Sequence, residues 1–352
     1  MSNLLTINNN IVQKTDLRNP QVSLGLGSEQ IGKKIGSVAI GYQAGLFSQG
    51  TASVSIGVEA GKFNPIINPI DQKGSNIAIG NQAGLSSQYQ YCVAIGNQAG
   101  QKQGNVCVAI GNQSGQIFQG SNSVSIGNQS GQTTQGFQSV SIGNQTGQFS
   151  QGFQSVSIGN QAGQFTQGFY SVSIGNQAGQ FSQGTSSVSI GNQAGQFTQG
   201  SGSVSIGNQA GQFTQGSGSV SIGNQAGQFS QGFGSVSIGY QAGQNSQGIN
   251  CISIGYQAGD ITQNQGSIAI GYQAGYVNQG SFSISLGYQA GLTNQSSNSI
   301  VINTDPNGWG SDVSYQTTPG FFLKGIRGET LGLGQNILVY NTVRNEIVYS
   351  FN

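Results

Sequence analysis

A motif that returns every 16 residues constrains this chain more than any other feature. Its clearest copy begins with Ser-Val-Ser-Ile-Gly at residues 155–159 and ends at Gly168. The glycine after the isoleucine, called here the marker glycine, recurs along the chain from Gly41 to Gly287, and partial copies at 22–25 and 300–303 add one turn at each end. A period this short indicates a repeat architecture in which each unit contacts mainly its neighbours. We therefore expect one solenoid rather than several globular domains.

Each repeat alternates polar and apolar residues with a period of two, which predicts a short half-buried strand. Val and Ile then point to one side and the two Ser residues to the other. A second short strand at 164–167 carries Phe as its expected buried member. The predicted core of three successive repeats consists of Val156, Ile158, Phe165, Val172, Ile174, Phe181, Val188 and Ile190. The glycines predicted to form the corners of one turn are Gly159, Gly163 and Gly168.

Stacking of successive turns predicts an all-β fold, a parallel β-solenoid of about 17 to 18 turns spaced about 4.8 Å apart. The rod would then be about 85 Å long. Identical residues line up in columns, and Asn160, Gln161 and Gln167 each belong to one of three predicted amide ladders. In such ladders side-chain amides bond to their copies along the stack. We interpret these three columns as structural rather than ligand-binding.

The composition excludes several classes of function. Charged residues are 5% of the chain, the net charge is +1 and histidine is absent. Nucleic-acid binding requires clustered Lys and Arg, so no nucleic-acid partner is expected. No catalytic set, metal-ligand cluster or phosphate-binding loop stands out, so we expect neither an enzyme nor a cofactor. Long apolar runs and a secretory signal pattern are also lacking, which argues against membrane insertion and a classical export signal.

The three cysteines occupy one position of the repeat, four residues before a marker glycine, where Ser is usual. They are Cys92, Cys107 and Cys251. Stacked in-register side chains have poor geometry for a disulfide. We therefore predict that all three are free and replace Ser structurally.

The array divides the chain into three parts. Residues 1–20 are an N-terminal cap, an attachment segment or a tail, residues 21–303 are the solenoid, and residues 304–352 are a small C-terminal β domain. Seven extra residues enter one turn in the insert at 58–74, and one residue is missing near 102–104. From Tyr240 onward, Tyr replaces the Asn that follows the marker glycine.

The C-terminal part contains a predicted β-hairpin, with strands at 337–340 and 346–349. A segment of this kind would cover the last turn, whose backbone groups are otherwise unpaired. The candidate contact residues at this tip are Trp309, Lys324, Arg327, Tyr340 and Arg344.

Tandem Ser-Val-Ser-Ile-Gly with glycine corners resembles the head domain of trimeric autotransporter adhesins. Ile-Gly-Tyr-Gln-Ala-Gly, at 40–45 and 270–275, is similar to head repeats of phage tail fibres and of fibre proteins of large DNA viruses. The segment at 320–327 and the two hairpin strands resemble the closing segment of fibre-like proteins of giant DNA viruses. The resemblance implies a left-handed β-roll, three chains around one axis and a role in surface attachment. The 16-residue period is longer than that of the bacterial adhesins, which favours a viral fibre.

Three hypotheses of function follow. The first is a homotrimeric fibre or spike on a virion or other extracellular surface, with a surface anchor protein and an unidentified receptor or glycan as partners. The second is a self-assembling filament, since exposed terminal strands are templates for pairing. The third, weaker one is an ice-binding-like array built on the regular columns of Ser.

Overall fold

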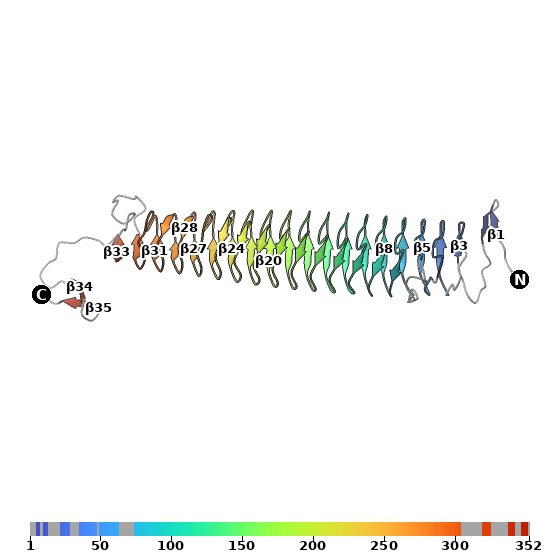
Figure 1. Ribbon diagram of the computed structural model, residues 1–352, viewed down its shortest axis with the longest axis horizontal. Helices are drawn as coiled ribbons and strands as arrows, with labels where there is room; N and C mark the ends of the chain where they lie inside the picture. The colour runs from blue at the N-terminus through green and yellow to red at the C-terminus, as the bar shows by residue number, and fades with distance from the viewer. Residues whose placement is uncertain are drawn as a thin grey trace.

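The computed structural model describes residues 5–7, 10–12, 22–28, 35–47, 49–62, 74–303, 319–324, 337–341 and 346–350, with the backbone alone at 5–7, 10–12, 323–324, 337–341 and 346–350. The fold is an all-β parallel solenoid with turns of about 16 residues, and its successive turns stack into a long rod (Figure 1). The predicted fold class is therefore confirmed.

The main sheet contains the first strand of every turn. Each strand pairs in parallel and in register with the strand of the next turn, as when Val156, Ser157 and Ile158 align with Val172, Ser173 and Ile174. The strands from β3 to β32 correspond to the turns counted in the sequence. They are β3 (Val22–Leu24), β4 (Val38–Ile40), β5 (Val54–Ile56), β6 (Ile77–Ile79), β8 (Val93–Ile95), β10 (Val108–Ile110), β12 (Val124–Ile126), β14 (Val140–Ile142), β16 (Val156–Ile158), β18 (Val172–Ile174), β20 (Val188–Ile190), β22 (Val204–Ile206), β24 (Val220–Ile222), β26 (Val236–Ile238), β27 (Ile252–Ile254), β29 (Ile268–Ile270), β31 (Ile284–Gly287) and β32 (Ile300–Asn303).

A second, narrower sheet runs along the other side of the turn. It consists of β7 (Ser87–Gln88), β9 (Lys102–Gln103), β11 (Phe118–Gln119), β13 (Thr134–Gln135), β15 (Ser150–Gln151), β17 (Thr166–Gln167), β19 (Ser182–Gln183), β21 (Thr198–Gln199), β23 (Thr214–Gln215) and β25 (Ser230–Gln231). Isolated bridges through Gln247 lead on to β28 (Ile261–Gln263) and β30 (Val277–Gln279). The second strand of the turn is therefore present, as predicted, but in most turns it is only two residues long.

The parallel stack extends beyond the array boundary predicted at residue 303. Strand β33 (Phe321–Lys324) pairs in parallel with β32, so that Phe322 aligns with Val301. Val301 occupies an inward position that is Ser or Ala in other turns, and it is buried against Ala290 with Phe322 packed on it. The polar interior of the rod thus ends in a small apolar cluster.

Two antiparallel hairpins flank the stack in the sequence, one before it and one after it. At the N-terminal side, β1 (Leu5–Ile7) pairs with β2 (Asn10–Val12). At the C-terminal side, β34 (Ile337–Asn341) pairs with β35 (Glu346–Ser350), which confirms the predicted hairpin.

The interior of the turn is polar, and the predicted core is wrong for the single chain. Ser155 and Ser157 are fully buried, whereas Val156 and Ile158 point outward and are half-buried, and Phe165 is 38% exposed. The same correction applies to Val172, Ile174, Phe181, Val188 and Ile190. Among the described residues, the buried apolar side chains are alanines, the three cysteines and Val301.

The reason for this arrangement is the narrow space inside a turn. The Ser157 hydroxyl donates to Gln167 Oε1 at 2.6 Å, so the two strands of one turn are joined directly by a hydrogen bond between small polar groups. Ala162 is the only apolar side chain that this turn buries. Val, Ile and Phe would not fit between strands this close, so the alternating pattern places them outside.

A relay of hydrogen bonds through Ser and Gln holds the interior together. Gln167 Nε2 donates to Val156 O at 2.9 Å and reaches Ser173 Oγ of the next turn at 3.4 Å, and Ser173 in turn donates to Gln183 Oε1. This pattern repeats along the rod. The predicted Gln167 ladder is therefore not a direct amide ladder in these turns, because a serine hydroxyl lies between successive amides.

Where Ala replaces the central Ser of the main strand, the relay shortens to a direct bond. Gln103 Nε2 donates to Gln119 Oε1 at 2.9 Å in the turn that contains Ala109, and Gln263 donates likewise to Gln279 at 3.1 Å beside Ala269. Within the described part of the chain only Ser23 Oγ, Ser37 Oγ and Gln88 Oε1 are buried without a partner. The polar interior is thus almost completely satisfied, as a buried polar network must be.

Three further columns are direct amide ladders. Asn160 Nδ2 donates to Asn144 Oδ1 at 3.1 Å and Gln161 Nε2 to Gln145 Oε1 at 3.1 Å, which confirms two of the predicted ladders. The third ladder, in which Gln164 Nε2 donates to Gln148 Oε1 at 2.9 Å, was not predicted from the sequence. All three run from one turn to the preceding turn.

The predicted corner glycines are required by close stacking. A Cβ on Gly159, whose φ is +137°, would lie 2.3 Å from the carbonyl oxygen of Gly175 in the next turn. A Cβ on Gly168 would meet the backbone of Gly184 at 2.6 Å. Both positions therefore need glycine because the next turn approaches too closely for any side chain.

Candidate functional site

The outward Val and Ile of the main sheet form two parallel apolar columns, called here the outer strip. Its members in β16 to β20 are Val156, Ile158, Val172, Ile174, Val188 and Ile190, all half-buried. The strip continues from β3 to β32, where Val22, Ile77 and Ile300 are exposed. An apolar surface of this length on a single chain is a candidate interface.

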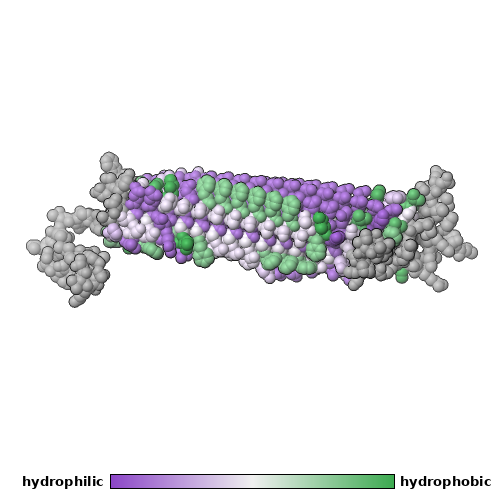
Figure 2. All heavy atoms as spheres, in the orientation of Figure 1, coloured by the Kyte–Doolittle hydropathy of each residue, from purple (hydrophilic) through white to green (hydrophobic). Residues whose placement is uncertain are grey.

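Stacked aromatic columns lie on the outside of the rod. Phe149, Phe165, Phe181, Phe197, Phe213 and Phe229 stack one on the next, with ring centroids 5.0 to 5.2 Å apart and planes within 14° of parallel. Each of these rings is 36 to 43% exposed. The interpretation of this column as core is therefore wrong for the single chain, and Figure 2 shows hydrophobic residues gathered in bands along the rod.

The replacement of Asn by Tyr from Tyr240 onward, noted in the sequence, produces a further aromatic column. Tyr240, Tyr256, Tyr272 and Tyr288 replace the Asn ladder, and their rings stack at 5.1 Å. Stacking of rings thus takes over from the amide bonds of the Asn column at this end of the array.

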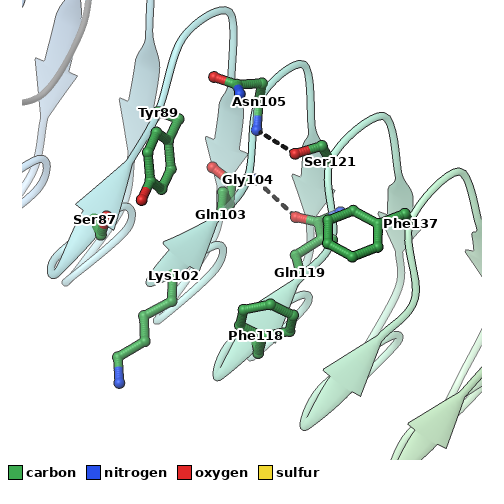
Figure 3. Close-up of a pocket in the computed structure, with 11 residues that line it drawn as sticks. Ser87, Tyr89, Lys102, Gln103, Gly104, Asn105, Phe118, Gln119, Ser121 and Phe137 are labelled. Atoms are coloured by element: carbon green, nitrogen blue, oxygen red, sulfur yellow. Dashed lines mark hydrogen bonds between the residues drawn. The ribbon is translucent and has the colours of Figure 1, made fainter.

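A pocket of about 350 Å³ opens where the repeat loses one residue (Figure 3). Its walls include Tyr89, Phe118 and Phe137, and Lys102 lies at its rim. The pairing of Lys102 with Ser87 and of Gln103 with Gln88 shows that the missing residue precedes Lys102 and corresponds to Phe165 in the clearest copy.

Glu59, at the base of the insert, replaces a Gln of the Gln161 column. Gln82 Nε2 donates to Glu59 Oε2 at 2.9 Å, but a carboxylate has no hydrogen to pass on to Gln43. Lys62 supplies the missing donor, since its ammonium bonds both Gln43 Oε1 at 2.5 Å and Glu59 Oε1 at 2.7 Å. The hydrogen bonds from Lys62 and Gln82 lower the pKa of Glu59.

Asp260 replaces a Gln of the Gln164 column and is 3% exposed. Burial raises the pKa of this carboxyl to about 6, while the Asn245 amide, which donates to Asp260 Oδ1 at 3.0 Å, opposes the rise. Burial of Tyr276 itself, followed by the charges of Asp260 and Tyr256, raises the pKa of that phenol. This carboxylate interrupts a ladder of neutral amides, and no basic side chain among the described residues pairs with it.

The cysteines are free, as predicted. Cys92 Sγ donates to Gly104 O at 2.9 Å and Cys107 Sγ to Gly120 O at 3.0 Å, which are the contacts that Ser155 Oγ makes with Gly168 O in its own turn. The adjacent Cys92 sulfur and burial both raise the pKa of the Cys107 thiol. These thiols therefore act as structural replacements for Ser.

The tip residues predicted from the sequence are not placed. Trp309, Arg327 and Arg344 lie outside the described residues, and at Lys324 and Tyr340 only the backbone is described. Within the described ranges, no group of three or more His, Cys, Asp and Glu could hold a metal ion. The same ranges contain no helix long and apolar enough to cross a bilayer.

Sequence reasoning missed the pocket and the outward orientation of the apolar columns. The departures at Tyr89, Lys102 and Phe118 were visible in the sequence, but only the structure shows that they face one space. Comparison of the chain with protein-family models, with curated proteins and with solved structures finds no match.

Proposed function

We propose that the chain is the shaft of a structural fibre in which three copies associate along their outer strips, on a virion or other extracellular surface. The observation that carries the proposal is the outward direction of Val and Ile in the main sheet. Removing a surface of this kind from water by covering it with another apolar surface is favourable.

The size of the outer strip supports association of copies. Two columns about 7 Å apart over about 85 Å cover on the order of 600 Å². This is at the upper end of the largest apolar patches on monomers, and it approaches the roughly 800 Å² that each partner contributes to a standard interface. A second copy of the same rod matches the strip in length and in spacing because its turns have the same 16-residue period.

Association of copies with parallel axes would leave each rod stiff, because hydrogen bonds between successive turns already run along its whole length. A stiff, nearly uncharged shaft is suited to hold an attachment segment away from a surface. In this proposal the attachment and anchoring functions belong to residues outside the repeat array, and the number of three copies follows from the resemblance to trimeric fibres.

Light scattering of the purified full chain tests the assembly. The expected mass is three times the 36.2 kDa of one chain. The mass of a single chain in native buffer would refute the proposal.

A matched pair of double variants tests the surface. Ile174→Lys with Ile206→Lys puts two charges on the outer strip, two turns apart, and is expected to dissociate the assembly. Thr166→Lys with Thr198→Lys puts the same charges, at the same spacing, on exposed positions of the second sheet and is expected to leave it intact. Circular dichroism monitors the fold of both variants, and equal masses for the two would assign the interface elsewhere.

A self-assembling filament remains the second candidate, and the unpaired edge of the main sheet favours it. Strand β3 pairs only with β4, so its other edge has no partner strand among the described residues. Electron microscopy at rising concentration separates the candidates, because discrete rods of constant length contradict end-to-end growth. The ice-binding hypothesis loses its basis, since the Ser columns that it requires are buried.

A further inference from the structure

Three consecutive turns depart from the repeat at the same side of the rod. Tyr89 stands where the clearest copy has the corner Gly168, and Phe118 stands where most turns have Thr or Ser. Between them, the turn that contains Lys102 lacks the residue before it. In an array of near-identical copies, three neighbouring departures that line one pocket indicate a local purpose distinct from that of the shaft.

The pocket has aromatic walls along the rod axis. Figure 3 shows Tyr89 at one end and Phe137 at the other, with Phe118 below them and Lys102 extending outward from β9. Phe118 is 50% exposed and Phe137 is 45% exposed, so their rings are available to a ligand. The volume of about 350 Å³ lies within the range of small-molecule sites.

The positive charge of Lys102 determines which ligands the pocket favours. Lys102 is the only basic residue between 74 and 303, and no ion pair of its ammonium is present in the described part of the chain. A lone cation beside aromatic rings repels cationic ligands and attracts an anionic group. The ligand is therefore expected to combine a ring with an acidic substituent.

Polar groups that line the pocket favour a hydroxylated ring. The Ser121 hydroxyl accepts the Asn105 backbone N–H at 3.0 Å and keeps its own hydrogen to donate. Asn105 is exposed, and its side-chain oxygen accepts the Gln90 backbone N–H at 3.3 Å. These groups can bond ligand hydroxyls, while the aromatic faces attract the C–H bonds of a sugar ring.

We propose that this pocket binds one acidic saccharide unit, a six-membered sugar ring with a carboxylate, through Lys102, Phe118 and Tyr89. The ring lies against the aromatic side chains and the carboxylate contacts the Lys102 ammonium. The two strands of one turn enclose the interior from opposite sides, so the pocket lies on the side of the rod away from the outer strip. The site can therefore be occupied whether or not the chains assemble.

Saturation-transfer NMR with the full chain and glucuronic acid tests the proposal. Transfer to the ring protons is expected, with a much weaker signal from glucose. Two variants restore the usual residue of the repeat and so preserve the fold. Lys102→Thr is expected to reduce the signal at least five-fold, and Phe118→Thr at least three-fold. Phe213→Thr removes an exposed ring remote from the pocket and is expected to leave the signal unchanged.

Several results would overturn the proposal. Absence of transfer to glucuronic acid excludes the site, and a signal unaltered by Lys102→Thr excludes recognition of the acid. Equal loss in Phe213→Thr would show nonspecific binding to aromatic columns. Benzoate serves as a carboxylate with an apolar ring, and its preferential binding would refute the saccharide assignment. None of these outcomes depends on the number of chains in the fibre.

Discussion

Replacement of Gln199 by alanine should destabilise the rod more than any single change at a neighbouring interior serine. Gln199 is 2% exposed, and its Nε2 contacts Val188 O at 2.9 Å, Ser203 O at 3.3 Å and Ser205 Oγ at 3.3 Å. Its Oε1 accepts the Ser189 hydroxyl at 2.6 Å. The variant removes the acceptor of the Ser189 hydroxyl and the side-chain donor to Val188 O, at about 1–3 kcal/mol for each buried group that loses its partner, and it opens a small cavity. We expect a loss of about 3–5 kcal/mol in the free energy of unfolding.

Ser189→Ala is the matched comparison, and its cost should be below about 1 kcal/mol. Gln183 Nε2 lies 3.4 Å from Ser189 Oγ and, once the hydroxyl is gone, can donate directly to Gln199 Oε1. The turn that contains Ala109 already has this arrangement, with 2.9 Å between Gln103 Nε2 and Gln119 Oε1. One hydrogen bond is therefore exchanged for another.

Chemical denaturation measures the two losses, and hydrogen exchange followed by mass spectrometry locates them. The exchange experiment is needed because a solenoid can open locally, turn by turn. Faster exchange should centre on the turns around 183–205 in Gln199→Ala and remain nearly unchanged in Ser189→Ala. Equal destabilisation by the two variants would refute the relay as the main interior contact.

Three further predictions concern ionisable groups. Burial raises the pKa of Asp260 from 3.8 to about 6, so its contribution to stability is complete below pH 3.8 and is lost as the pH rises through 6; Asp260→Asn should therefore raise the melting temperature at pH 7 and flatten its dependence between pH 4 and 6. Lys62 lowers the pKa of Glu59, so stability from this pair is lost as the pH falls below 4.5, and Glu59→Gln should remove that acid-dependent component of a pH-melting profile. A thiol reagent should label the chain slowly when folded and at three sites when denatured, and rapid labelling of folded protein would contradict burial of Cys92, Cys107 and Cys251.

The sequence predicted the period, the number of turns, the strand positions and the corner glycines, because each depends on local pattern. It did not predict which face of the strand is inside. Alternation defines two faces, and the general preference for buried apolar residues assigned Val156 and Ile158 to the interior. The space within the turn is too narrow for this arrangement, and small side chains, mainly Ser and Ala, fill it together with hydrogen-bonded Gln.

Variation among the repeats carried a signal for this orientation. Ser157 corresponds to Ala in several other turns, among them Ala94, Ala109 and Ala269, which indicates a small enclosed volume. The column of Gln167 is Gln in every complete turn from β6 to β31, whereas the column of Phe165 also contains Ser, Thr, Asn, Ile and Val. A column that tolerates both Phe and Ser is typical of a surface. The pocket was beyond sequence reasoning because it depends on how three irregular turns face one another.

The direct amide ladders give the rod a side-chain dipole along its axis. Asn160, Gln161 and Gln164 each donate to the turn before, so the side-chain dipoles in these three columns point the same way and add along the axis. The N-terminal end of each ladder presents amide N–H groups, and its C-terminal end presents amide carbonyl oxygens. The Gln161 ladder reaches Gln289, near the end of the array, and a second rod can continue this ladder only head to tail, because the opposite orientation places acceptors against acceptors. Any filament of such rods would therefore have distinct ends.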